Sequence, residues 1–363
     1  MSTANVVPET WELTGDDARR TLRDTGIRTV LADGARRFRW ADGFSHSRAL
    51  AFQIVLAFVP AVLVAAGIAV LTDEDGVRRS ILGTIQAIVP GPAGEVFQQA
   101  ADHGAEHADT VGGPAGFTLA ALAMLVSAAT AFGQIERGTN RIYGVERDRP
   151  MLRKYGVAAL MTCSAGLLLV VGFVLLAVGR ELTDTLADSP WRLVWSIGRW
   201  PLGIVALIAG ETIVFRVSPK RRQPGFTWLA FGAAIAAAAN VLASVVLSKY
   251  LAESGEFDDV YGPVAGLLGV MIWAYLLSIG LFYGVATAAQ LEAIRAGRAA
   301  PQSEEKVVDS EPASSDDPLP DDTDERDERG EDQSVGDAGG MAPAGAEEPD
   351  EPDEEPEVAS HRA

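Results

Sequence analysis

Apolar residues in this chain gather into six runs, each about twenty residues long, with polar segments between them. An α-helix needs about 20 residues to cross a hydrocarbon core about 30 Å thick. The pattern therefore predicts an all-α protein, a polytopic membrane helix bundle with six transmembrane helices, and excludes a purely soluble globular protein. The predicted spans are 49–71, 115–135, 156–179, 193–215, 226–247 and 263–289.

The basic residues of the connections alternate in number along the chain. Eight Lys and Arg precede the first span, and the next five connections hold 2, 6, 2, 4 and 1. Because basic residues accumulate in short loops on the cytoplasmic side, we expect a multi-pass protein of the cell (inner) membrane with both termini cytoplasmic. The segments 136–155 and 216–225 would also be cytoplasmic, opposite 72–114, 180–192 and 248–262.

The formal net charge of −19 belongs to one end of the chain. Residues 301–363 hold 23 acidic and 4 basic side chains. Residues 299–363 have almost no large apolar side chains, so they cannot bury enough surface to offset the entropy of ordering. We predict a disordered acidic cytoplasmic tail. It either associates with the basic loops, which would otherwise attract anionic headgroups of membrane lipids, or stays solvated.

Residues 1–48 form a predicted cytoplasmic segment ahead of the first span. Between residues 14 and 40, seven arginines, Arg37 among them, alternate with apolar side chains such as Phe38. This mixture is typical of an amphipathic helix in the membrane interface, with apolar side chains in lipid and arginines among the headgroups. The alternative is a soluble cap that packs on the helix ends.

Few polar residues lie within the predicted spans. Arg199 and Glu211 are the ionisable pair of the fourth span, and Asn240 lies in the fifth. A charge at membrane depth is costly and indicates a functional site by default. The alternative is that both charged side chains snorkel from positions near the span ends. For Asn240 we favour a hydrogen bond between helices over a ligand contact.

Two prolines interrupt the first and fourth predicted spans at corresponding places in the two three-helix halves. Matched broken helices indicate a midplane binding site in transporters, although prolines also kink helices that transport nothing. The candidate solute path therefore consists of Pro60, Arg199, Pro201, Glu211 and Asn240.

Glycines four residues apart occur twice near the last span, as Gly262 with Gly266 and as Gly280 with Gly284. This spacing permits close contact of helices. The contact would lie either within the bundle or between the subunits of a homo-oligomer.

The segment His103-Gly104-Ala105-Glu106-His107 has the spacing of an inverted zinc-protease motif. It lies in a predicted loop of about forty residues without a third ligand or a catalytic domain, so we expect a solvated helix. The single cysteine, Cys163, cannot build a disulfide framework or a cysteine zinc site. The sequence predicts no enzyme, no metal site and no cofactor.

Three stretches, 45–60, 140–150, and 215–222 together with 261–275, are similar to the YihY/virulence factor BrkB family of bacterial inner-membrane proteins. The residues that carry the resemblance best are Asn140, Arg141, Tyr143, Gly144, Tyr261, Gly262 and Pro263. The resemblance implies six helices with both ends cytoplasmic, a link to envelope phenotypes, and transport as a suggested role. Many members end the last helix in Gly-Ala-Glu, where this chain has Gly284-Val285-Ala286, so that carboxylate is not carried over.

Family members have also been labelled as a transfer-RNA-processing ribonuclease. Such an enzyme needs a cluster of His and Asp ligands, which four histidines spread along this chain cannot supply. We therefore expect no nucleic-acid partner. Two hypotheses remain, a transporter-like protein that moves or shelters an envelope solute or lipid, and a scaffold that recruits envelope machinery. The first predicts a continuous polar cavity between helices one, four and six, and the second predicts dry packing.

Overall fold

The computed structural model describes residues 4–72, 114–145, 149–177, 191–253, 264–298 and 300–301. The chain divides into two compact units, Met1–Ser310 and Glu311–Ala363. The second unit, with most of the predicted acidic tail, lies outside the described residues. So do the histidine motif at 103–107 and the motif residues Tyr261, Gly262 and Pro263.

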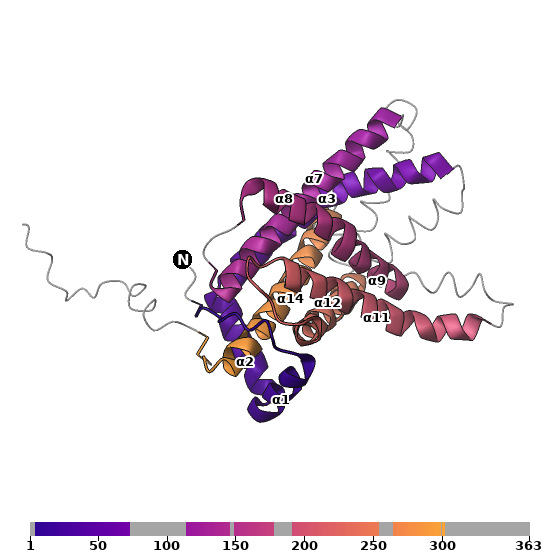
Figure 1. Cartoon of the computed structure of the whole chain (residues 1–363). Coiled ribbons are helices and arrows are strands. Elements are labelled where there is room, and N and C mark those ends of the chain that lie inside the picture. The colour runs from indigo at the N-terminus through magenta and orange to yellow at the C-terminus, as the bar shows by residue number, and fades with distance from the viewer. Residues whose placement is uncertain are drawn as a thin grey trace, which may run out of the picture. The chain divides into compact units, whose positions relative to one another are not determined.

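Every regular element in the described ranges is a helix. Each predicted apolar run corresponds to one long helix or one continuous helical stretch (Figure 1). These are α3 (Gly43–Thr72), α7 (Pro114–Tyr143), α8 (Met151–Met161) continued by the π-helical turn η1 (Thr162–Gly166) and α9 (Leu167–Ala177), α11 (Arg192–Val217), α12 (Phe226–Glu253) and α14 (Ala265–Arg295).

Five of these stretches are long and apolar enough to cross a membrane by length and composition: α7, α8 to α9, α11, α12 and α14. They expose large apolar side chains such as Leu119 and Leu122 of α7, which a bilayer solvates and water does not. The all-α polytopic membrane class is thus confirmed. The helix α3 is 30 residues long and covers the first predicted run, and the count of six spans stays a prediction.

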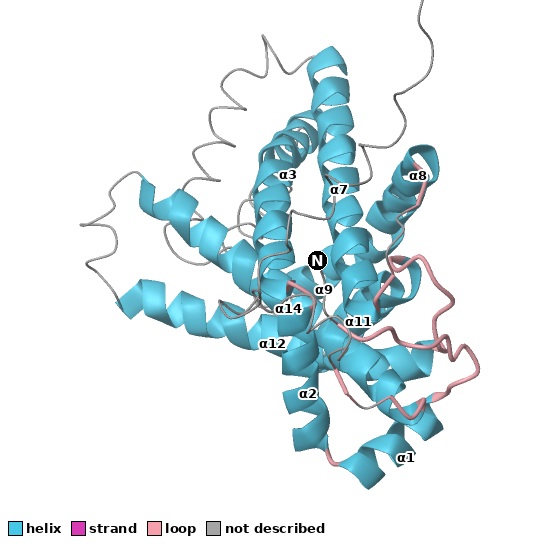
Figure 2. Ribbon diagram, turned by 90° about the vertical axis from the view of Figure 1, so that its left-hand side faces the viewer, coloured by secondary structure: helices cyan, strands magenta, loops and turns pink. Residues whose placement is uncertain are grey.

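The helices pack in pairs, α3 with α7, α9 with α11, and α12 with α14, and α14 also packs against α3 (Figure 2). The contact between α12 and α14 is backbone to backbone. A Cβ on Gly232 would lie 2.6 Å from the Gly284 carbonyl oxygen, closer than any side chain could approach. The second predicted glycine pair is therefore used within the bundle.

One end of the bundle is closed by the residues ahead of α3. We call this the capped end, where α7, α11 and α14 finish and α8 and α12 begin. Residues 4–13, here called the strap, cross it, and α1 (Gly15–Thr25) and α2 (Ile27–Trp40) follow. The helix α1 begins where the Asp17 carboxylate accepts the Thr14 N–H and hydroxyl, which lowers the pKa of Asp17.

The helix α2 packs along α14. A Cβ on Gly34 would lie 3.1 Å from the Thr287 Cα, and the Tyr283 hydroxyl donates to the Leu31 carbonyl. Phe38 and Arg37 are buried on this face. The expectation that Arg37 lies among lipid headgroups is wrong, because its guanidinium is enclosed by protein. The interfacial role of the other arginines stays a prediction.

Candidate functional site

A cavity of about 320 Å³ lies within the bundle, with walls from α3, α7, α9, α11, α12 and α14. This volume falls at the lower end of the range for small-molecule sites, about 300–1,000 Å³. The described lining side chains are Ala, Leu, Ile, Val and Phe, with three polar exceptions among them, Glu211, Asn240 and Ser278. The cavity reaches the first, fourth and sixth helices, as the transporter hypothesis requires, but its described lining is mostly apolar, so these residues do not show the expected continuous polar path.

Glu211 and Asn240 form the polar patch from two helices. The Asn240 side-chain amide donates to Oε1 of Glu211 at 2.9 Å, and both residues are buried. The expected interhelical hydrogen bond of Asn240 is confirmed. A Cβ on Gly280 would overlap Oδ1 of Asn240, so the amide packs directly against this glycine of α14.

Two atoms of this patch have no hydrogen-bond partner among the described residues, Oε2 of Glu211 and Oδ1 of Asn240. Buried polar groups are nearly always paired with protein, water or ligand. The patch therefore holds two buried oxygens that no described group satisfies.

Arg199 does not approach Glu211. They lie twelve positions apart on α11, a distance of about 18 Å along the axis at 1.5 Å per residue. Arg199 donates instead to the Leu176 carbonyl at 3.5 Å and lies over the Trp200 ring, 4.9 Å from its centroid. The sequence grouped these two charges, and the structure separates them.

The two prolines do not break their helices, because α3 continues through Pro60 and α11 continues through Pro201, and both prolines lie apart from the polar patch. Pro60 is half-buried within α3 and Pro201 is exposed on α11. The described lining of the cavity includes neither proline and not Arg199. Of the five candidate path residues, the structure brings together Glu211 and Asn240.

The resemblance residues at the end of α7 lie at the capped end. The Asn140 side-chain oxygen accepts the Lys220 N–H at 2.8 Å, and the Tyr143 carbonyl accepts the Val7 N–H at 3.2 Å. Gly144 has φ 74° and its Cα faces the strap, where a Cβ would lie 2.8 Å from the Val6 Cα. Arg141 is exposed on the same turn. These residues join α7 to the strap and to the α11–α12 connection.

Arg149, just after this motif, closes the end of α11. Its guanidinium donates to the carbonyls of Val217, Ser218 and Pro219 at 2.7 to 2.9 Å, and lies 3.2 Å from the Glu136 carboxylate. The last carbonyls of a helix have no partner within it, so a side chain that reaches them stabilises the helix end.

The shortest ion pair among the described residues of the capped end is one that sequence reasoning missed. Arg221 and Glu292 form an ion pair at 2.7 Å, with side chains 2% and 0% exposed. The strap completes it, because Thr10 donates its hydroxyl to Glu292 at 2.6 Å and the Pro8 carbonyl accepts from Arg221 at 2.9 Å. Arg221 also lies over the Tyr143 ring at 4.5 Å.

A second buried arginine joins the same region. Arg37 donates to the Gln290 side chain at 2.8 Å, to the Asn5 carbonyl at 2.8 Å and to the Ile142 carbonyl at 3.2 Å. Burial lowers the pKa of Arg37 to about 10, which leaves it charged at neutral pH. The sequence held one sign of the buried Arg221–Glu292 ion pair, because Glu292 is an acidic residue that continues the apolar face of the last helix.

Among the residues that the structure describes, no group of three His, Cys, Asp or Glu side chains could hold a metal ion. Cys163 is exposed within η1. The buried acidic side chains that the structure describes instead contact an amide, as Glu211 does, or pair with arginines, as Glu136 and Glu292 do.

Comparison with known proteins gives the family. Residues 35–308 match the family model of Virulence factor BrkB, which covers most of the chain. The chain therefore belongs to the Virulence factor BrkB family. No solved structure matches it.

The curated relatives of this chain include proteins that are named as membrane proteins. A UPF0761 membrane protein of Rhodospirillum rubrum is 29% identical over 75% of this chain, and one of Chromobacterium violaceum is 27% identical over 69%. The chain spans 60% and 58% of the lengths of these two relatives. A Bacillus subtilis protein named as ribonuclease-like, YfkH, is 24% identical over 68% of this chain and 90% of its own length.

Proposed function

For this member of the Virulence factor BrkB family, we propose a transporter-like role in which the bundle binds and moves an envelope lipid or lipid-like solute. The observation that carries the proposal is the Glu211–Asn240 patch on the wall of a largely apolar cavity. Apolar walls suit the hydrocarbon part of a ligand, and a few placed polar groups fix its orientation. No covalent chemistry is part of this role.

The unpartnered oxygens of Glu211 and Asn240 indicate the polar group of the ligand. Oδ1 of Asn240 is an acceptor, and a carboxyl oxygen accepts when the group is ionised and donates when it is protonated, so the complementary ligand carries a group that can do both, such as a hydroxyl. A carboxyl group at membrane depth is costly, so its presence in this wall indicates a site that binds a ligand. Pro60, Arg199 and Pro201 would belong to a wider path only if the helices rearrange around the cavity.

A scaffold without transport is the rival role. It needs no cavity and no buried carboxyl group away from its docking surface. The polar patch therefore favours a ligand over dry packing, and the two roles differ in whether filling the cavity matters.

The test is mass spectrometry of lipids and small molecules that co-purify with the full chain. Ala128→Phe on α7 would place a ring in the cavity, whereas Ala123→Phe on the same helix faces outward and serves as the control. We expect a species bound to the wild type and to Ala123→Phe that is lost from Ala128→Phe and weakened in Glu211→Gln. Equal recovery from all four proteins would contradict the proposal.

A further inference from the structure

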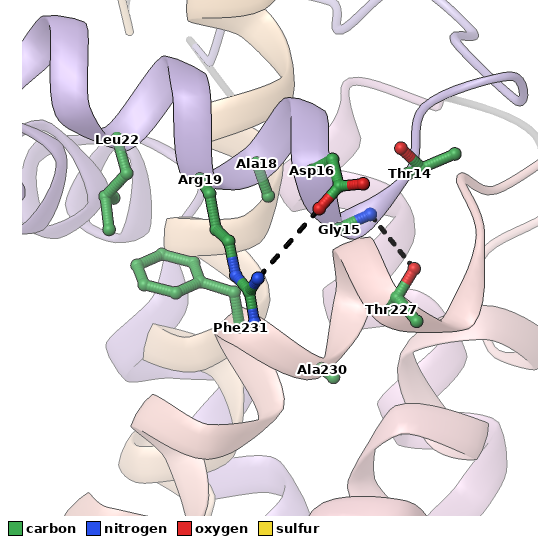
Figure 3. A pocket seen from close by; sticks show the side chains of 9 residues that line it. All are labelled: Thr14, Gly15, Asp16, Ala18, Arg19, Leu22, Thr227, Ala230 and Phe231. Carbon is green, nitrogen blue, oxygen red and sulfur yellow. Dashed lines mark hydrogen bonds and ion pairs between the residues drawn. The ribbon is translucent and has the colours of Figure 1, made fainter.

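A second hollow, of about 480 Å³, lies on the capped end between α1 and the first turns of α12 (Figure 3). It shares no lining residue with the bundle cavity. The Gly15 N–H donates to the Thr227 hydroxyl at 3.0 Å and fixes the start of α1 against the second residue of α12. Since α12 is long and apolar enough to span from Phe226, this groove lies at the level where a span meets lipid headgroups.

The walls of the groove divide into an apolar floor and a polar rim. Ala18, Leu22, Ala230 and Phe231 form the floor. The rim carries an ion pair, in which an Arg19 nitrogen lies 3.9 Å from an Asp16 oxygen, with both side chains more than four-fifths exposed. Figure 3 shows this pair on α1, on the side that faces α12.

The apolar floor continues along α12 toward the middle of the bundle. Ala234 and Ile235 are half-buried below Phe231, and Ala238 and Leu242 are exposed further along the same side. Positions three and four residues apart lie on one helix face. This stripe of small and branched side chains offers a path for an acyl chain that starts at the groove.

We propose that this groove is a binding site for a phospholipid with an ethanolamine headgroup. The guanidinium of Arg19 would bind the phosphate, the carboxylate of Asp16 would bind the ammonium group, and the acyl chains would follow α12. An exposed ion pair contributes little by itself, so exchange of its partners costs little. A headgroup with both charges pairs with both side chains, whereas a purely anionic headgroup would be repelled by the Asp16 carboxylate.

The neighbouring acidic residue does not compete for the lipid amine. Asp17 accepts two hydrogen bonds from Thr14 and lies 3.7 Å from Arg295. Asp16 is therefore the carboxylate that the groove offers.

The experiment reconstitutes the full chain in vesicles of equimolar phosphatidylethanolamine and phosphatidylglycerol and counts the retained lipids by native mass spectrometry. We expect the wild type to retain phosphatidylethanolamine in excess. Arg19→Ala should lower retention about fivefold, the loss expected for one basic side chain near a lipid phosphate. Ala230→Phe, which fills the floor, should lower it as well. The control Arg20→Ala removes an exposed arginine of α1 outside the groove and should change nothing.

Asp16→Asn tests the contact with the ammonium group. This variant should lose the preference for ethanolamine over glycerol headgroups and should still retain phospholipid. Equal retention of both lipids by the wild type would overturn the proposal. So would unchanged retention in Ala230→Phe, or equal losses in Arg19→Ala and Arg20→Ala. The losses in Arg19→Ala and Ala230→Phe relative to the wild type and to Arg20→Ala do not depend on the bundle cavity, which these variants do not touch.

Discussion

Glu292 illustrates how one residue of the last helix ties distant segments together. Its carboxylate binds Arg221, 71 positions away in the sequence, and Thr10, 282 positions away. A buried charge is tolerated where its partner and its hydrogen bonds are both present. The capped end meets this condition with two helices and the strap.

We predict that Glu292→Gln destabilises the folded protein by about 3–5 kcal/mol, because it leaves the Arg221 guanidinium buried and unpaired. Thermal unfolding in detergent should register the loss. Glu253→Gln removes an exposed carboxylate at the end of α12 and is the matched control. A double variant, Glu292→Leu with Arg221→Met, should recover most of the stability, since neither charge remains. A melting temperature of Glu292→Gln equal to that of the wild type would contradict the assignment.

At the scale of elements, the strap holds the capped end without any regular structure of its own. Its backbone binds Tyr143 at the end of α7, Arg221 and Gly225 in the α11–α12 connection, and Pro301 after α14. Each of these bonds uses a group that a helix end or a connection leaves unpaired. The strap thus links helices whose transmembrane parts belong to different pairs.

We predict that Thr10→Val loosens the strap without a change in side-chain shape. Valine keeps the shape of threonine but leaves Glu292 without its hydroxyl donor, which should cost about 1–3 kcal/mol at a buried acceptor. Limited proteolysis at residues 4–14 should become faster in this variant. Val6→Ala, which trims a half-exposed strap side chain, should leave the cleavage rate close to the wild type. Equal rates in all three proteins would show that the strap does not depend on Glu292.

For the whole molecule, the two ends of the described unit lie side by side. The Asn5 N–H donates to the Pro301 carbonyl at 3.0 Å. A chain whose ends lie on the same face of a membrane crosses it an even number of times. The five stretches that satisfy the length and composition of a span, together with α3, would make six.

We therefore predict six spans with both ends cytoplasmic. In a Cys163→Ser background, a cysteine in place of Arg147 should react only from the cytoplasmic face, and one in place of Asp109 only from the outer face. Membrane-impermeant thiol labelling of intact and opened cells measures both. Labelling of residue 147 from outside would exclude this topology.

The sequence by itself determined the helices and their membrane character. Run length and apolarity are local properties that the bilayer thickness selects, so 226–247 predicts α12 without knowledge of any neighbour. The interhelical role of Asn240 was also accessible, because an amide among apolar residues needs a partner. The sequence did not predict where the helices end, since α7 continues past its apolar run to Tyr143 and packs at the capped end.

Only the tertiary structure decided which residues meet. Glu211 binds Asn240 and not Arg199, since the rotation of α11 and α12 about their axes, and the glycine at 280, set that contact. Arg37 looks like any interfacial arginine in the sequence, yet α2 places it inside protein. Partner choice depends on helix rotation and close packing across long sequence separations, and the local pattern of polar and apolar residues does not encode either.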